Sequence, residues 1–185
     1  MQDEDLVTET HSVSEADFGP IGHMLLGVSK LWSVIGGLAF VGLVGMSLVS
    51  IIGRKLYSLP VPGDMEVLQM VAASASACFF GYCHLRGGDV KVDFFTHNLG
   101  PRVTLLLDAF GSLGVGLMGA LLAWRTLVGA LSLREAGETS PILEWPIWVA
   151  ELVMVPGFIL LALAGFYMVF VSIRARGAHR VAVQS

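Results

Sequence analysis

The stretch LWSVIGGLAFVGLVGMSLVSII, residues 31–52, holds 22 residues without one charged side chain. At a rise of 1.5 Å per residue, a helix of this length crosses about 30 Å, the thickness of the hydrocarbon core of a bilayer. Six acidic residues precede the stretch, and Lys30 is the only Lys or Arg before it. A secretory signal peptide begins with basic residues and has a shorter apolar core, so we expect this stretch to remain in the membrane as a helix.

Three further apolar blocks follow in this chain of 185 residues, which is 55 % hydrophobic and 14 % charged. Soluble domains contain about 25 % charged residues, so the composition indicates an integral membrane protein. The blocks predict an all-α fold with four transmembrane helices. We expect one membrane domain, residues 25–176, between an acidic, disordered tail of residues 1–24 and a short tail of residues 177–185. The predicted spans are residues 31–52, 67–85, 103–124 and 152–173.

The distribution of Lys and Arg predicts the orientation of the chain. With four spans, both termini lie on one side of the membrane, together with the connector between the second and third spans. That side receives seven of the eleven Lys and Arg residues, and the other side receives four. Because cytoplasmic segments carry the excess of Lys and Arg, we expect both termini in the cytoplasm.

The first connector, residues 54–66, lies on the non-cytoplasmic side in this prediction. Its prolines and its glycine prevent a continuous helix. Asp64 stands where it could cap the second span, and Glu66 would fall in the first helical turn, where negative charge is favourable. An alternative is an ion pair between Arg54 and Glu66 across the membrane surface.

The second connector lies within YCHLRGGDVKVDFFTHNLGPR, residues 82–102. Two glycines are expected to end the second span, and Asp89 is expected to cap a short amphipathic helix over residues 90–99. Val92 and Phe95 would lie on one apolar stripe of that helix, which predicts a position in the cytoplasmic interface. A short strand remains an alternative, because apolar and polar residues also alternate here.

The third connector contains two prolines that break the helical pattern, with Trp145 and Trp148 on either side of the second one. Tryptophans at the start of a span are typical of the interfacial belt. A docking surface for another protein is the alternative.

Small residues recur every four positions in the second and third spans, which lets helix backbones approach closely in lipid. These ladders could pack the chain's own bundle or dock a partner. Their members are Ala73, Ala77 and Gly81, and Ser112, Gly116 and Ala120.

Residues that would indicate chemistry within the spans are few. His84 is the only histidine near a span, whereas haem needs histidines that face one another. Cys78 and Cys83 would point about 140° apart on one helix, which disfavours a disulfide or a shared metal. Ionisable groups in the membrane mark transport paths, and the candidates here are Asp108 within the third span and Arg125 at its end. The sequence shows no internal repeat of the kind that transport folds commonly have. We therefore expect no enzymatic activity, no cofactor or metal, no nucleic-acid partner and no substrate path of the chain's own.

The connectors together resemble the DctQ family, the small membrane subunit of tripartite ATP-independent periplasmic (TRAP) transporters. The likeness covers about residues 31–176 and rests on the order of the runs GRKLY, PVPGDMEVLQ, CHLRGGDVKVDFF and LEWPIWVAELVMVPGF. Asp89 stands where the family usually has histidine, so no role of that histidine is transferred. The matching positions are Arg54, Pro60, Pro62, Gly63, Asp64, Glu66, Arg86, Gly87, Val90, Val92, Asp93, Pro146, Trp148, Pro156, Gly157 and Phe158.

The resemblance implies a lipid-embedded subunit of the bacterial inner membrane that scaffolds a large multi-helix membrane subunit. That partner would carry out sodium-coupled uptake of an organic acid, such as a C4-dicarboxylate, delivered by a periplasmic binding protein. The segment of residues 89–99 would brace the complex at the inner membrane surface. A stand-alone four-helix membrane regulator and the small subunit of a tripartite tricarboxylate transporter remain alternatives. The candidate interface or structural residues are Arg54, Glu66, Arg86, Asp89, Val92, Asp93, Phe95, Asp108, Trp145 and Trp148.

Overall fold

Four long helices make up the part of the chain that the computed structural model describes. This part comprises residues 20–57, 62–87 and 101–182, with the side chains of residues 57, 101–106, 108 and 174–182 left undescribed. Each predicted span lies within one helix, so the prediction of an all-α protein with four helices is confirmed. The only strand-like pairing among the described residues is an isolated bridge between Thr139 and Pro146. The helices are α1 (Pro20–Tyr57), α2 (Asp64–Leu85), α4 (Pro101–Ala136) and α5 (Ile147–Ala182).

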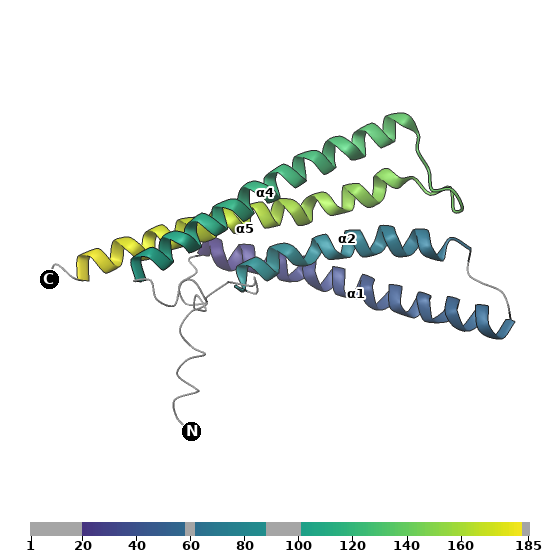
Figure 1. The fold of residues 1–185 in the computed structure, drawn as a ribbon, viewed down its shortest axis with the longest axis horizontal. Coiled ribbons are helices and arrows are strands. Elements are labelled where there is room, and N and C mark those ends of the chain that lie inside the picture. Colours follow the sequence, from purple (N-terminus) through teal and green to yellow (C-terminus); the bar gives the residue numbers. More distant parts are fainter. Residues whose placement is uncertain (1–19, 58–61, 88–100, 183–185) are drawn as a thin grey trace, which may run out of the picture.

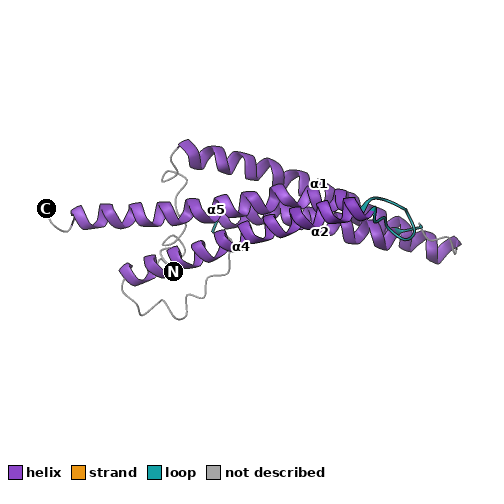
Figure 2. Ribbon diagram, turned by 90° about the horizontal axis from the view of Figure 1, so that it is seen from above, coloured by secondary structure: helices purple, strands orange, loops and turns teal. Residues whose placement is uncertain are grey.

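The helices run alternately in opposite directions, so that the start of α1 and the end of α5 lie at the same end of the molecule (Figure 1). We call the opposite end, residues 50–57, 62–66 and 134–151, the turn end. Figure 2 shows the loops of the turn end gathered at one end of the helices. Which end faces the cytoplasm stays a prediction.

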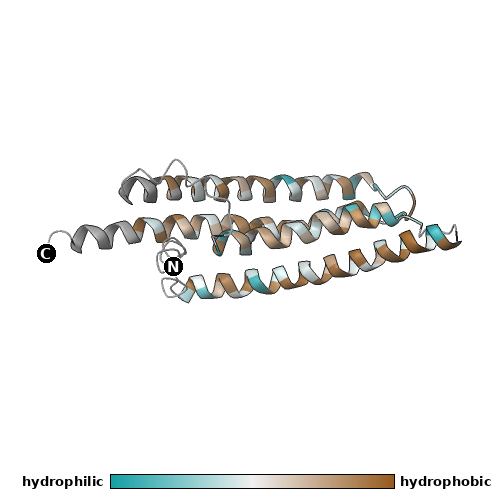
Figure 3. Ribbon diagram, turned by 60° about the horizontal axis from the view of Figure 1, so that its bottom comes forward, coloured by the Kyte–Doolittle hydropathy of each residue, from teal (hydrophilic) through white to brown (hydrophobic). Residues whose placement is uncertain are grey.

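In space the helices follow the order α4, α5, α2, α1 (Figures 1 and 3). α5 packs on both α4 and α2, whereas α1 packs on α2 and barely touches α5. The two central helices are therefore α2 and α5, and α1 and α4 form the edges.

Small residues set the close approach of neighbouring helices. A Cβ atom added at Gly36 would lie 2.9 Å from the carbonyl oxygen of Ala75, and one added at Gly157 would collide with the carbonyl of Ala77. At the α4–α5 contact, a Cβ atom at Gly165 would lie 2.6 Å from the Cα of Gly116. Backbone contact of this kind is how helices pack in lipid, where van der Waals attraction replaces the hydrophobic drive. Ala77, Gly81 and Gly116 of the predicted ladders thus pack the chain's own helices.

Large apolar side chains point outward along the edge helix α1, which Figure 3 shows as a mostly brown ribbon. Leu38 is 68 % exposed and Val41 is 70 % exposed. All four helices contain a stretch long and apolar enough to cross a bilayer. In water, such exposure would be costly; in hydrocarbon, these side chains are solvated by lipid.

The helix ends follow from local chemistry. α4 begins at Pro101, whose fixed φ and missing N–H suit the first helical position. It ends before Gly137, which has a φ of +66° and donates its N–H to the carbonyl of Arg134 at 3.3 Å. α2 begins at Asp64, and the capping position is taken by Gly63 with a φ of +73°. The expectation that Asp64 itself caps α2 was therefore wrong by one residue.

Candidate functional site

Glu66 of α2 binds the connector between α4 and α5 at the turn end. Its carboxylate accepts a hydrogen bond from the hydroxyl of Ser140, which is 2 % exposed. It also accepts the backbone N–H of Ile142 at 2.9 Å and of Leu143 at 3.1 Å. One carboxylate on α2 thus holds the connector that leads from α4 to α5. We call this group of residues, Glu66, Ser140, Ile142 and Leu143, the Glu66 clamp.

The connector held by the clamp is itself folded. Ser140 donates its N–H to the carbonyl of Trp145 at 2.8 Å, and Glu144 donates its N–H to the carbonyl of Ser140 at 3.0 Å. Leu143 lies directly against Gly63, where a Cβ atom would come within 2.5 Å of its side chain. Gly63 is thus required for two reasons: its φ is positive, and a Cβ atom there would collide with the side chain of Leu143. The two connectors of the turn end meet at this point.

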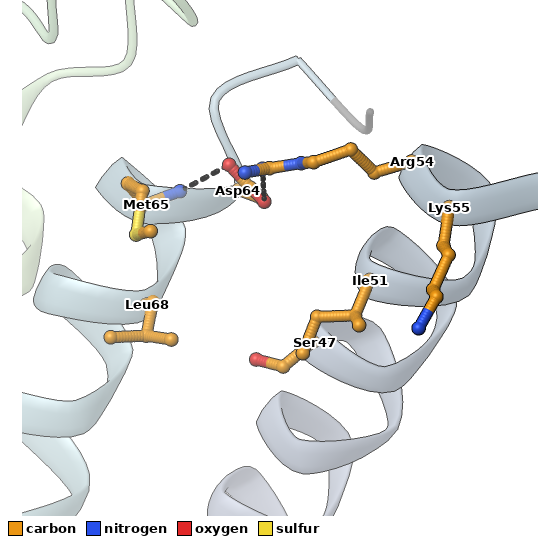
Figure 4. A pocket seen from close by; sticks show the side chains of 7 residues that line it. All are labelled: Ser47, Ile51, Arg54, Lys55, Asp64, Met65 and Leu68. Atoms are coloured by element: carbon orange, nitrogen blue, oxygen red, sulfur yellow. Dashed lines mark hydrogen bonds and ion pairs between the residues drawn. The ribbon is translucent and has the colours of Figure 1, made fainter. Parts of the chain in front are cut away.

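Asp64 performs a different task on the opposite side of α2 (Figure 4). Its Oδ2 accepts the hydroxyl of Ser50 at 2.5 Å and the guanidinium of Arg54 at 3.1 Å. Its Oδ1 accepts the N–H of Met65 at 2.8 Å. Ser50 is 1 % exposed, so Asp64 ties α2 to the buried side of α1.

The predicted ion pair between Arg54 and Glu66 is wrong, because Arg54 pairs with Asp64. Residues 64 and 66 are separated by about 200° around a helix, so the two carboxylates point to opposite sides. Asp64 faces α1, and Glu66 faces the α4–α5 connector. The packing of α2 against α1 and α5 sets the rotation of α2 and thereby this division of roles.

The two tryptophans of the turn end differ in their surroundings. The guanidinium of Arg134 lies over the ring of Trp148 at 5.4 Å, which joins the end of α4 to the start of α5. Trp145 is 55 % exposed. Trp148 therefore has a contact within the chain, and Trp145 presents its ring to the surroundings.

Three residues that were not predicted from the sequence also lie at the turn end. Ser50 and Ser140 are buried hydroxyl groups that each reach a carboxylate. Glu151 lies against α4 at Gly129, and its Oε2 is buried without a hydrogen-bond donor in the described part of the chain. Ser140 had one signal in the sequence: it precedes Pro141 in a turn, where serine hydroxyls often bond to neighbouring groups.

Of the remaining predicted residues, Arg86 and Asp108 lie toward the end of the molecule opposite the turn end. The Nε–H of Arg86 donates to the hydroxyl of Tyr82 at 3.2 Å, and its guanidinium lies 5.6 Å from the centre of that ring. Asp108 belongs to α4, but its side chain is outside the described part. The amphipathic helix and its residues Asp89, Val92, Asp93 and Phe95 also lie outside the described residues, and so stay predictions.

The described polar groups are suited to holding helices together. Asp64 and Glu66 are hydrogen-bonded to other parts of the chain. Cys78 and Cys83 are free thiols. Among the side chains that the structure describes, no group of three His, Cys, Asp or Glu could hold a metal ion. The hydrogen bonds of Asp64 and Glu66 therefore connect helices and loops of the chain.

Comparison with known proteins identifies the family. The sequence model of the family described as "Tripartite ATP-independent periplasmic transporters, DctQ component" matches residues 43–175, which extend from within α1 into α5. No curated protein and no solved structure matches the chain. The resemblance seen in the connectors is confirmed. With its four membrane-crossing helices, the chain is a multi-pass membrane protein and belongs to the DctQ family, a component of TRAP transporters.

Proposed function

We propose that the chain is the small membrane subunit of a TRAP transporter in the bacterial inner membrane, with both termini in the cytoplasm. In this role it scaffolds a large membrane subunit that takes up an organic acid with sodium. A periplasmic binding protein delivers the substrate to the turn end. The observation that carries the proposal is the family match over residues 43–175.

The distribution of polar groups supports a scaffold. The described carboxylates with hydrogen bonds, Asp64 and Glu66, lie at the turn end and connect helices of this chain. The helix packing in between is mainly between small and apolar residues, together with the buried His84 and a hydrogen bond from the hydroxyl of Ser74 to the carbonyl of Ala150. Ions and carboxylates need polar groups along their path, and such groups are expected on the large subunit.

We infer that the exposed face of the edge helix α1 contacts the large subunit. Gly42 and Gly45 leave open space, since a Cβ atom at either position would meet nothing within 4 Å in this chain. Side chains as large as Val41 flank them, 70 % exposed. A helix of a partner can approach such a surface closely.

Reconstitution tests the proposed role. The chain, the large subunit and the binding protein are combined in vesicles with a sodium gradient, and uptake of a labelled organic acid is measured. We expect uptake only when all three proteins are present. Solute accumulation by this chain alone would contradict the proposal, and full transport without it would favour the alternative of a stand-alone regulator.

Matched glycine variants test the proposed face. Gly42→Leu combined with Gly45→Leu should reduce co-purification of the large subunit, while leaving the melting temperature of the isolated chain unchanged. Gly111→Leu combined with Gly114→Leu provides the control, because these glycines of α4 also meet nothing within 4 Å. Loss of the partner only in the α4 variant would move the interface to the other edge.

The brace proposed for residues 89–99 is tested separately. Replacing Val92 and Phe95 together by Asp should lower recovery of the large subunit in a pull-down, because charge would prevent the apolar stripe from lying in the interface. Unchanged recovery with unchanged transport would contradict the brace, whereas the proposed contact through α1 would be unaffected.

A further inference from the structure

A hollow of about 400 Å³ opens between α1 and α2 at the turn end (Figure 4). Its mouth is charged, and its floor is apolar: Ile51 from α1 and Met65 from α2 contribute side chains that are 61 % and 60 % exposed. The hollow is lined by Ser47, Ile51, Arg54, Lys55, Asp64, Met65 and Leu68.

The mouth carries a net positive charge. Arg54 and Lys55 each contribute one positive charge and Asp64 contributes one negative charge, which leaves one positive charge in excess. The oxygens of Asp64 are engaged by α1 and by its own helix. Lys55 points away from Asp64, and no carboxylate in the described part of the chain lies within ion-pairing distance of it (Figure 4). The ammonium group of Lys55 is therefore available to an anion.

The hollow lies where a bilayer changes from hydrocarbon to headgroups. Residues 31–53 contain no charge, and at 1.5 Å per residue they extend over about 35 Å. Arg54 and Lys55 are thus the first charges beyond the hydrocarbon core, at the depth where Lys and Arg meet lipid phosphates. Ser47 and Ile51 lie one to two turns deeper on the same helix, at the depth of acyl chains.

We propose that this hollow binds one anionic phospholipid. Its phosphodiester lies between Lys55 and Arg54, and one acyl chain covers Ile51, Met65 and Leu68. The single excess positive charge of the mouth matches the single negative charge of such a lipid. A zwitterionic lipid fits less well, because its own cation would come close to Lys55. The inference requires only that the chain spans a membrane and does not depend on the proposed transport role.

Native mass spectrometry of the purified full chain tests the proposal. The chain is offered phosphatidylglycerol and phosphatidylcholine with identical acyl chains, in equal amounts, and retained lipid is measured. We expect phosphatidylglycerol to be retained in preference. Lys55→Gln should weaken its binding about fivefold, since one cation near a lipid surface contributes about 1 kcal/mol. Lys55→Arg should keep it.

Two further variants separate charge from shape. Arg125→Gln removes the same charge from an exposed position on α4 outside the hollow, and should bind the lipid as the unmodified chain does. Ile51→Trp leaves the charges in place and fills the floor, and should lower retention. Helix content by circular dichroism and the gel-filtration profile verify that each variant is folded.

The outcomes that overturn the proposal are distinct. Equal retention of the two lipids, or unchanged binding by Lys55→Gln, would show that the mouth does not select an anion. Displacement of the lipid by excess glycerol 3-phosphate would assign the site to a soluble anion. Loss of the lipid when the chain is isolated together with a second membrane protein would assign the hollow to that protein.

Discussion

α5 and α1 differ in how far the chain itself covers their apolar surfaces. Of the most apolar part of α5, 50 % of residues are buried within the chain, against 17 % for α1. Gly157 and Gly165 of α5 let two neighbouring backbones approach, whereas Gly42 and Gly45 of α1 face open space. Lipid solvates exposed apolar side chains, so exposure alone does not identify an interface. Unfilled glycine positions occur on α1 and also on α4, at Gly111 and Gly114, so they indicate edge surfaces that a helix of another protein could approach closely.

The same side chain placed on both helices should affect them very differently. Gly157→Leu should destabilise the chain by roughly 3 kcal/mol, because the new atoms collide with the backbone of α2 at Ala77. Gly45→Leu should leave stability unchanged or slightly higher, since Leu favours a helix more than Gly does. Unfolding of the purified chain in mixed micelles with increasing dodecyl sulfate measures both variants. Equal losses would show that α1 is packed as tightly as α5.

A second test concerns the Glu66 clamp, which supplements the packing of the central helices with polar bonds. Glu66→Ala removes the acceptor of Ser140 and of two backbone N–H groups. Hydrogen exchange at the amides of Ile142 and Leu143 should become about tenfold faster. In the variant, exposing these N–H groups to water no longer requires breaking a hydrogen bond to Glu66. Glu135→Ala serves as control, since this exposed acid lies outside the clamp. Unchanged exchange in Glu66→Ala would mean that the connector is held by its own bonds alone.

At the turn end, substitutions of Trp148 and Trp145 should differ by a smaller amount. Trp148→Leu should lower stability by about 0.5–1 kcal/mol, because it removes the stacking of Arg134. Trp145→Leu should leave the isolated chain nearly unchanged, since this ring is 55 % exposed. The same micelle unfolding measures both. If Trp145→Leu proved the more damaging variant, its ring would have to be assigned to the chain's own packing.

The sequence was sufficient to predict the helices, because bilayer thickness imposes a length on each apolar block. Residues 31–52 alone meet that requirement, and they lie inside α1. The partners of charged side chains could not be obtained in the same way. Glu66 is closer in sequence to Arg54 than to Ser140, yet it bonds to Ser140. Whether Glu66 or Asp64 faces α1 depends on how α2 is rotated about its axis, and the packing of α2 against α1 and α5 sets that rotation.

Contacts between helices were harder still to anticipate. The ladders of small residues indicated surfaces suited to close packing, but their partners depend on the order of the helices in space. Gly81 packs on Leu160, and Gly116 packs on the backbone at Gly165 and Phe166. Ala73, from the same ladder as Gly81, is exposed. Periodicity thus identifies candidate faces, and only the assembled helices show which are used.

The Glu66 clamp can form only late during synthesis of the chain. The carboxylate belongs to the first pair of helices, whereas its donors, Ser140, Ile142 and Leu143, leave the ribosome more than 70 residues later. In the nascent chain, Glu66 must therefore stay hydrated at the bilayer surface until the hairpin of α4 and α5 has been synthesised. A chain truncated before residue 140 retains Glu66 without these three hydrogen-bond donors.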